Sequence, residues 1–256
     1  MNITFLGTGT STGVPAIGCS CPVCTSSDPK DRRLRSSLLI SDENGSAVII
    51  DTGPDLREQC LRYKVTHLDG VLYTHAHMDH IAGLDDLRRF NILSGKGLCV
   101  YASAPVIGQL KHLYRYAFPE RYTSADIPCL IPAEITHGIP FTVGDISITP
   151  LPAEHGKGKT TCFLFENWAY CTDISGIPPE TASYLSNLSL LIIGALRKKP
   201  HPKHFSFKQA AETIEQLQPR QALLTHLGHD VLHRNQHDVI PLQHAEFAYD
   251  GMSVEI

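Results

Sequence analysis

Three imidazoles and one carboxylate fall within six positions of the stretch Leu72-Tyr73-Thr74-His75-Ala76-His77-Met78-Asp79-His80. The stretch begins with a short apolar run that is typical of a buried strand, so the polar residues are expected in the loop at its carboxyl end. Alternate residues of an extended chain point the same way, so His75 and His77 can converge on one metal ion. A turn then lets Asp79 and His80 face a second ion. Imidazole and carboxylate suit zinc, manganese or iron, and an incomplete shell leaves room for water.

The composition indicates a folded protein with a substantial core. Of 256 residues, 42% are hydrophobic and 19% are charged, which argues against long disordered regions. The formal net charge of −4 argues against a protein that coats nucleic acid, because that function needs a basic surface. A small anionic substrate is still compatible with this charge, because a local cationic site can lie in an acidic protein.

The sequence carries no sign of export or of a membrane span. It opens on a strand-like run at residues 3–6 without a basic leader, and no apolar stretch approaches the roughly 20 residues that a bilayer requires. We therefore expect a cytoplasmic protein with no membrane partner. In a reducing compartment, clustered cysteines suggest a metal site rather than disulfides.

Short apolar runs alternate with turns and helical patterns along the whole chain. Strands are expected at residues 3–6, 37–41, 47–51, 70–73, 146–151, 162–166, 169–172, 190–193 and 221–225. Helices are expected at residues 54–63, 81–90, 179–185 and 207–217. No linker separates the two halves, so the pattern predicts one α/β domain over residues 1–256, with two mixed sheets packed together and helices outside.

The spacing His75-x-His77-x-Asp79-His80 resembles the signature of the metallo-β-lactamase superfamily. The resemblance implies a four-layer αββα sandwich of two mixed β-sheets. It also implies further ligands at the ends of later strands, namely His155, Asp173 and His226.

The resemblance implies a role for each of these residues. One catalytic ion would be held by His75, His77 and His155. The other would be held by Asp79, His80 and His226, with Asp173 as the bridge and Asp79 counted as a catalytic residue as well. The pair is expected to be zinc or manganese.

Asp51, which ends the apolar run at residues 47–51, has two open interpretations. It either supports a ligating histidine from behind, or it forms the turn before Gly53.

A second metal site is expected on the loop that contains Cys19, Cys21 and Cys24. Structural zinc takes four ligands, and the candidate for the fourth is His229, three residues after His226. This pairing resembles the PhnP-type phosphoribosyl cyclic phosphodiesterases, in which such a loop and a late histidine hold structural zinc. Three reduced cysteines without metal remain the alternative. If zinc binds, one loop presents His226 to the catalytic pair and His229 to the structural ion.

Two close metal ions can lower the pKa of a water between them toward about 7, and the hydroxide can then attack phosphorus. The leaving oxygen needs a proton, and the candidate general acid is His204, which precedes the helix expected at residues 207–217. Its segment resembles the one that supplies a catalytic histidine in PhnP-type enzymes and in transfer-RNA 3′-processing nucleases. His201 is the nearby alternative. Six basic residues flank this region and either attract phosphate or form a solvated face: Lys157, Lys159, Arg197, Lys198, Lys199 and Lys203.

The leading hypothesis is a metal-dependent phosphodiesterase that hydrolyses a small cyclic or nucleotide-like phosphodiester. A transfer-RNA 3′-processing ribonuclease shares the core motifs, but no long insertion resembles a clamping arm. A non-hydrolytic metal-binding accessory protein of cofactor biosynthesis is the third hypothesis. The sequence does not decide between a monomer and a homodimer.

Overall fold

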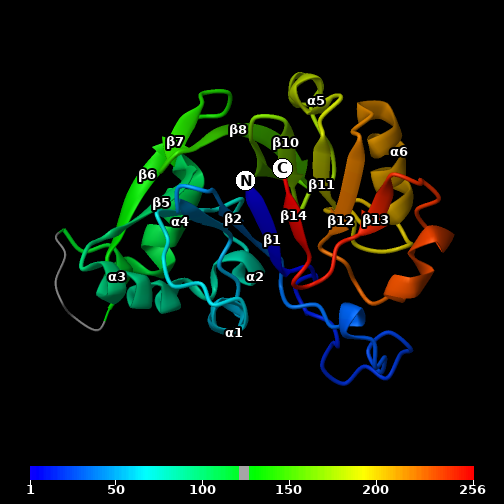
Figure 1. Cartoon of the computed structure of the whole chain (residues 1–256), viewed down its shortest axis with the longest axis horizontal. Helices are drawn as coiled ribbons and strands as arrows, with labels where there is room; N and C mark the ends of the chain where they lie inside the picture. The colour runs from blue at the N-terminus through cyan, green and yellow to red at the C-terminus, as the bar shows by residue number, and fades with distance from the viewer. Residues whose placement is uncertain (121–126) are drawn as a thin grey trace.

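Two seven-stranded sheets lie face to face in the computed structural model, which describes residues 1–120 and 127–256 (Figure 1). The first sheet has the order β14-β1-β2-β3-β4-β5-β6. Its strands are β1 (Asn2–Gly7), β2 (Ser37–Ser41), β3 (Ala47–Ile50), β4 (Gly70–Leu72), β5 (Leu98–Ser103), β6 (Leu130–Ile135) and β14 (Ser253–Glu255). The second sheet has the order β13-β12-β11-β10-β9-β8-β7. Its strands are β7 (Phe141–Val143), β8 (Ile146–His155), β9 (Gly158–Leu164), β10 (Trp168–Cys171), β11 (Leu190–Gly194), β12 (Gln221–Thr225) and β13 (Ala245–Phe247).

Helices cover the outer face of each sheet (Figure 1). The α-helices are α1 (Leu56–Arg62), α2 (Met78–Ile81), α3 (Arg88–Ser94), α4 (Ala104–Leu113), α5 (Pro179–Leu185) and α6 (Phe207–Leu217). The 3-10 helices are η1 (Pro29–Asp31), η2 (Leu84–Leu87), η3 (Arg115–Ala117) and η4 (His233–Asp238). None of the helices in the described ranges is long and apolar enough to cross a membrane.

Three separate hydrophobic clusters hold these layers together. The middle cluster joins the inner faces of the sheets, for example Phe5 of β1 with Phe163 of β9. A second packs the outer face of the first sheet against α3 and α4, and a third packs the outer face of the second sheet against α5 and α6. Each fully buried Leu, Ile or Phe contributes roughly 1.5–3 kcal/mol. Three cores between four layers make an αββα sandwich, so the fold predicted from the sequence is confirmed.

The parallel strands bring several carboxyl ends to one edge of the sandwich. β3 runs parallel to β4 in the first sheet, and β10, β11 and β12 run parallel in the second. Three residues within two positions of the ends of these strands have left-handed backbone: Asp51 (φ +62°), Asp173 (φ +52°) and His226 (φ +57°). Non-glycine residues rarely adopt this conformation, and it occurs most often at functional sites.

The continuous helix expected at residues 81–90 is wrong. The segment is divided into α2, η2 and α3. The Gly83 N–H donates to Thr52 O at 2.8 Å, outside the helical ladder. A Cβ at Gly83 would lie 2.2 Å from Gly53 O, so two backbone segments meet here in direct contact. This long-range contact interrupts the helix that the local apolar period favours.

Candidate metal centre

The first group of candidate ligands comes from both sheets. His75 and His77 follow β4, His155 ends β8, and Asp173 follows β10. One ligand atom from each lies within 4.8 Å of all the others. His75 Nε2 is 2.9 Å from His77 Nδ1. The alternation of an extended chain after β4 therefore turns both imidazoles to one point.

The second group consists of Asp79, His80, Asp173 and His226, again with ligand atoms within 4.8 Å of one another. Asp173 belongs to both groups. Its Oδ1 lies 2.9 Å from His226 Nδ1, and its Oδ2 lies 3.4 Å from His80 Nε2 and 3.7 Å from His75 Nε2. One carboxylate thus contacts donor atoms of both groups, and the seven residues named from the sequence meet at this one place.

The donor atoms suit divalent ions. Both ring nitrogens of His155 are buried without a hydrogen bond to the described residues, and His80 Nε2 is buried against the carboxylates of Asp79 and Asp173 at 3.3 and 3.4 Å. Burial lowers the pKa of His75 well below its ordinary value and also lowers that of His155. Both imidazoles are therefore neutral at pH 7 and offer lone pairs, which metal binding requires.

His80 has the opposite electrostatics. Burial disfavours its charge, but the carboxylates of Asp173 and Asp51 outweigh burial and raise its pKa well above the ordinary value. Asp51 Oδ2 is 2.6 Å from His80 Nδ1 and also accepts from Thr74 Oγ1 at 2.8 Å. Asp51 thus orients His80 from behind, as the first of its two interpretations expected. Its backbone is left-handed at φ +62°, but the turn in this segment begins at Pro54, so only the first interpretation is supported.

Cys19, Cys21, Cys24 and His229 form a third group. The three Sγ atoms lie 3.4, 3.3 and 3.5 Å from His229 Nδ1. Tetrahedral zinc with bonds of ~2.3 Å to sulfur and ~2.0 Å to nitrogen places these atoms about 3.5 Å apart. Burial opposes ionisation of Cys21, but hydrogen bonds from Cys24 N–H and from His229 outweigh it and lower the pKa of the thiol to about 6. The loop is therefore shaped for a structural ion.

His204 lies directly against the first two ligand groups. Its ring centroid is 4.9 Å from that of His155 and 5.0 Å from that of His226, and its Nδ1 is 3.7 Å from Asp173 Oδ2. Burial lowers the pKa of His204 to about 3, against the attraction of Asp173. The ring of His201 lies beside it, tilted by 39°, with the two ring centroids 5.0 Å apart. Of the two histidines named from the sequence, the geometry favours His204 as the one that meets a bound group.

Two cavities open onto the metal groups. A cavity of about 350 Å³ is lined by Ser11, His77, Asp79, Asp173, His201, Pro202, Lys203, His204 and His226. A larger one of about 780 Å³ extends from His75, His77 and His155 to the start of α4. Three of the six basic residues line it: Lys157, Lys159 and Lys203. None of these three ammonium groups forms an ion pair within residues 1–120 and 127–256.

Sequence reasoning missed two residues that hold His226. Thr10 Oγ1 lies 3.2 Å from His226 Nε2, and Ser36 Oγ lies 3.3 Å from its Nδ1. They stand 216 and 190 positions from His226 in the chain. Small hydroxyl residues at such separations form no motif, so no local signal could have identified them.

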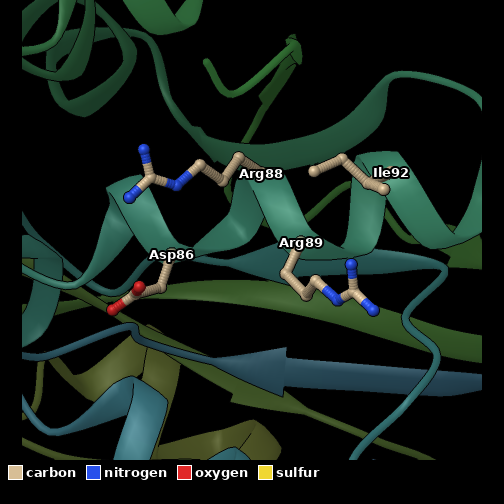
Figure 2. Close-up of a pocket in the computed structure, with 4 residues that line it drawn as sticks. All are labelled: Asp86, Arg88, Arg89 and Ile92. Carbon is tan, nitrogen blue, oxygen red and sulfur yellow. The ribbon is translucent and has the colours of Figure 1, made fainter. Parts of the chain in front are cut away.

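A separate pocket of about 210 Å³ lies on α3, where Asp86, Arg88, Arg89 and Ile92 line it (Figure 2). The side chains of Arg88 and Arg89 point in different directions around the helix in this view. The pocket shares no residue with the three candidate metal groups, so we assign it no chemistry.

Comparisons with known proteins agree with this arrangement. Residues 46–227 match the family described as Beta-lactamase superfamily domain, which is more than half of the chain. A crystal structure described as a new diphosphatase from the PhnP family superposes with a TM-score of 0.91 at 36% identity, covering 100% of this chain and 96% of that one. Zn²⁺-bound PqqB from Methylobacterium extorquens has a TM-score of 0.81 over 100% of both chains, but at 15% identity it shows the fold alone.

Among curated proteins, an octanoyltransferase of Porphyromonas gingivalis is 38% identical over 258 residues, covering 100% of this chain and 52% of the relative. This chain thus spans about half the length of the first curated relatives it matches. The family match and the PhnP-family structure together show that this chain belongs to the metallo-β-lactamase superfamily and is of the PhnP type.

Proposed function

We propose that this protein is a metal-dependent hydrolase that cleaves a small phosphodiester, cyclic or nucleotide-like, with two catalytic zinc or manganese ions. The single observation that carries the proposal is that two ligand groups share Asp173 and that His204 lies beside them. The similar PhnP-family protein is described as a diphosphatase, which supports phosphoryl chemistry at such a site.

Bound at these positions, two divalent ions would supply Lewis acidity toward the phosphoryl oxygens and a water of lowered pKa. The protein's own groups supply the rest. In the overall step, water adds to phosphorus and gives up one proton to solvent, the bond to the leaving oxygen breaks, and that oxygen takes up one proton. His204 is the residue placed to donate this proton. Because burial keeps it neutral in the free protein, we propose that the anionic substrate raises its pKa on binding.

The larger cavity supports a substrate of small-molecule size. Its volume of about 780 Å³ lies within the range of roughly 300–1,000 Å³ that is usual for such sites. Lys157, Lys159 and Lys203 give this cavity a cationic wall, which suits an anionic ligand. A diphosphate is the second candidate substrate, because the cationic wall and the description of the PhnP-family protein both favour it.

The test is turnover by protein that is first freed of metal and then reconstituted with Zn²⁺ or Mn²⁺. The substrates are bis-p-nitrophenyl phosphate, ribose cyclic phosphates, a dinucleoside diphosphate, a precursor transfer RNA and an octanoyl thioester. The thioester is included because of the P. gingivalis relative. We expect hydrolysis of the small diesters or the diphosphate, and none by Asp173→Ala. Faster cleavage of the precursor transfer RNA would support the ribonuclease, and two bound ions without any turnover would support the accessory protein.

A further inference from the structure

Arg33 is a buried arginine that the proposed chemistry does not use. It follows η1 and is 1% exposed. Its Nη1 donates to the carbonyl of Gly228, and its Nη2 donates to the carbonyl of Val231 at 3.2 Å and to Asp31 Oδ1 at 3.3 Å. One guanidinium therefore spans from the segment after the cysteine loop to two carbonyls of the loop at residues 226–233.

Asp31 extends this contact on both sides. Its Oδ1 also accepts from the backbone N–H of His233 at 2.7 Å, and its Oδ2 accepts from Ser26 Oγ at 2.7 Å. Asp31 itself is 2% exposed. The Arg33–Asp31 pair thus holds both the chain that leaves the cysteine loop and the far end of the 226–233 loop.

The loop at residues 226–233 carries candidate ligands of two different sites. His226 belongs to the group with Asp79, His80 and Asp173, which we call the catalytic site. His229, three residues later, belongs to the group with the three cysteines, which we call the thiolate site. The Gly228 carbonyl that Arg33 holds lies between them in the chain. Leu227 N–H donates to Thr8 O and Gly228 N–H donates to Leu196 O, both at 2.8 Å. The backbone is therefore held from several directions at the point where it must aim two imidazoles at different ions.

The charges around Arg33 suit this position. Burial lowers the pKa of its guanidinium, and the negative groups of Asp31, Asp250 and Cys24 act in the opposite direction. A guanidinium stays protonated under these conditions. Three thiolates and one neutral imidazole around a zinc ion leave a net charge of −1. A buried cation near Cys24 therefore stabilises that charge as well as the loop.

We propose that Arg33 is a positioning residue that couples the thiolate site to the catalytic pair. By fixing the carbonyls of Gly228 and Val231, it sets the relative placement of His226 and His229, so that loss of the clamp weakens metal binding at both sites. This inference rests on metal occupancy of the two sites, which is part of the proposed function, and it does not depend on which bond the protein cleaves.

The experiment compares metal binding by wild type, Arg33→Met, Arg33→Lys and Leu110→Ala. Leu110 is a buried residue of α4 and belongs to none of the three candidate metal groups, so its variant controls for general destabilisation. Competition with a chromophoric chelator measures zinc affinity at each site, and the absorption of bound Co²⁺ reports on the thiolates. For Arg33→Met we expect roughly 10–100-fold weaker binding at both sites, the range for residues that orient metal ligands. Arg33→Lys should recover part of the affinity because it keeps the charge.

Two results would overturn the coupling. One is wild-type affinity at either site in Arg33→Met. The other is a loss of zinc affinity in Arg33→Met that is no larger than the loss in Leu110→Ala, when the two variants show the same decrease in Tm. If Arg33→Met does not fold, Asp31→Asn decides, because it releases Arg33 and the His233 N–H together: unchanged metal affinity in that variant ends the proposal, and weakened affinity at both sites supports it. The experiment measures metal affinity and not turnover, so its result can be interpreted even if the protein is not a phosphodiesterase.

Discussion

Asp173 combines several properties that the candidate metal centre depends on. It bridges the two ligand groups, lies against His204, and has a left-handed backbone with φ +52°. A strained non-glycine backbone costs of order 1–3 kcal/mol, and Asp51 and His226 have the same conformation. Asp51, Asp173 and His226 all lie at strand ends beside the candidate metal groups, and strained backbone of this kind clusters at functional sites.

His204 should matter most when the leaving group is a poor one. We expect His204→Ala to keep its metal content but to lose about 10²–10⁴-fold in kcat on a diester with an alkyl leaving group, the usual size of general acid catalysis. The loss should be much smaller on bis-p-nitrophenyl phosphate, because p-nitrophenolate needs little protonation. Steady-state kinetics on both substrates, with His201→Ala as the matched control, measure this. Equal losses on the two substrates would contradict proton donation.

His80 predicts a pH effect on metal binding. Asp173 and Asp51 raise its pKa against burial, so the metal-free protein carries a protonated His80 at pH 7. An ion that takes Nε2 must displace that proton, whereas His75 and His155 are already neutral. His80 should therefore release about one proton at pH 7 when the catalytic pair is loaded, and affinity should fall as the pH falls below the raised pKa.

Calorimetry in two buffers of different ionisation enthalpy measures this proton release, starting from protein whose thiolate site already holds zinc. Asp51→Asn removes one of the three carboxylates that lie within 3.4 Å of a ring nitrogen of His80, so the variant should release clearly less. The same number of protons from wild type and Asp51→Asn would show that Asp51 does not set the protonation of His80.

At the scale of the element, the sequence predicts what local forces decide. The bounds of α6 and β12 agree with the expected ranges 207–217 and 221–225. Ser206 and Gln209 explain the sharp start of α6, because they form a capping box there. The order of the ligand loops also follows from the sequence, because each ends an apolar run.

Other elements depend on contacts that the sequence does not display. The run β5-α4-β6 escaped prediction although it forms one end of the first sheet and the wall of the larger cavity. In β6 only Leu130 and Ile135 are buried, so the strand has neither a continuous apolar run nor a clean alternation. The break between α2 and α3 likewise arises from the contact of Gly83 with Gly53, which lie 30 positions apart in sequence.

Two glycine substitutions should have opposite effects on the free energy of unfolding, one at this contact and one in open space on α4. In Gly83→Ala the new methyl group meets Gly53 O, so the variant should lose about 1–3 kcal/mol in free energy of unfolding. Metal binding at the Asp79–His80 group should weaken too, because Gly53 also packs against Asp79 O. A methyl group added at Gly108 in α4 would have no atom of the described residues within 4 Å, so Gly108→Ala should gain about 0.5–1 kcal/mol. Denaturant unfolding checks both, and a Gly83→Ala protein as stable as wild type would refute the packing argument.

At the scale of the whole molecule, the metal groups connect the two sheets. The segment after β4 of the first sheet, which includes α2, carries His75, His77, Asp79 and His80, while the ends of strands β8, β10 and β12 of the second sheet carry His155, Asp173 and His226. Each group takes ligands from both, so an ion at either position ties one half of the sandwich to the other. The hydrophobic core between the sheets holds them together but does not fix their relative orientation, because hydrophobic burial is not directional. Bound ions would fix the positions of the two carboxyl-end edges relative to each other.

Metal loading should therefore raise the melting temperature as well as create activity. At a free metal concentration of 100 times Kd, each site adds about 2.7 kcal/mol. For a chain of this size each kcal/mol shifts Tm by roughly 2–4 °C, so one catalytic site accounts for about 5–10 °C. Scanning calorimetry of chelated and reloaded protein measures the shift. Cys21→Ala should keep part of the increase in Tm on metal loading. Asp173→Ala should lose most of the increase that comes from the catalytic ions. Because Asp173 belongs to both groups, a shift that survives its replacement would mean that the ions do not join the sheets.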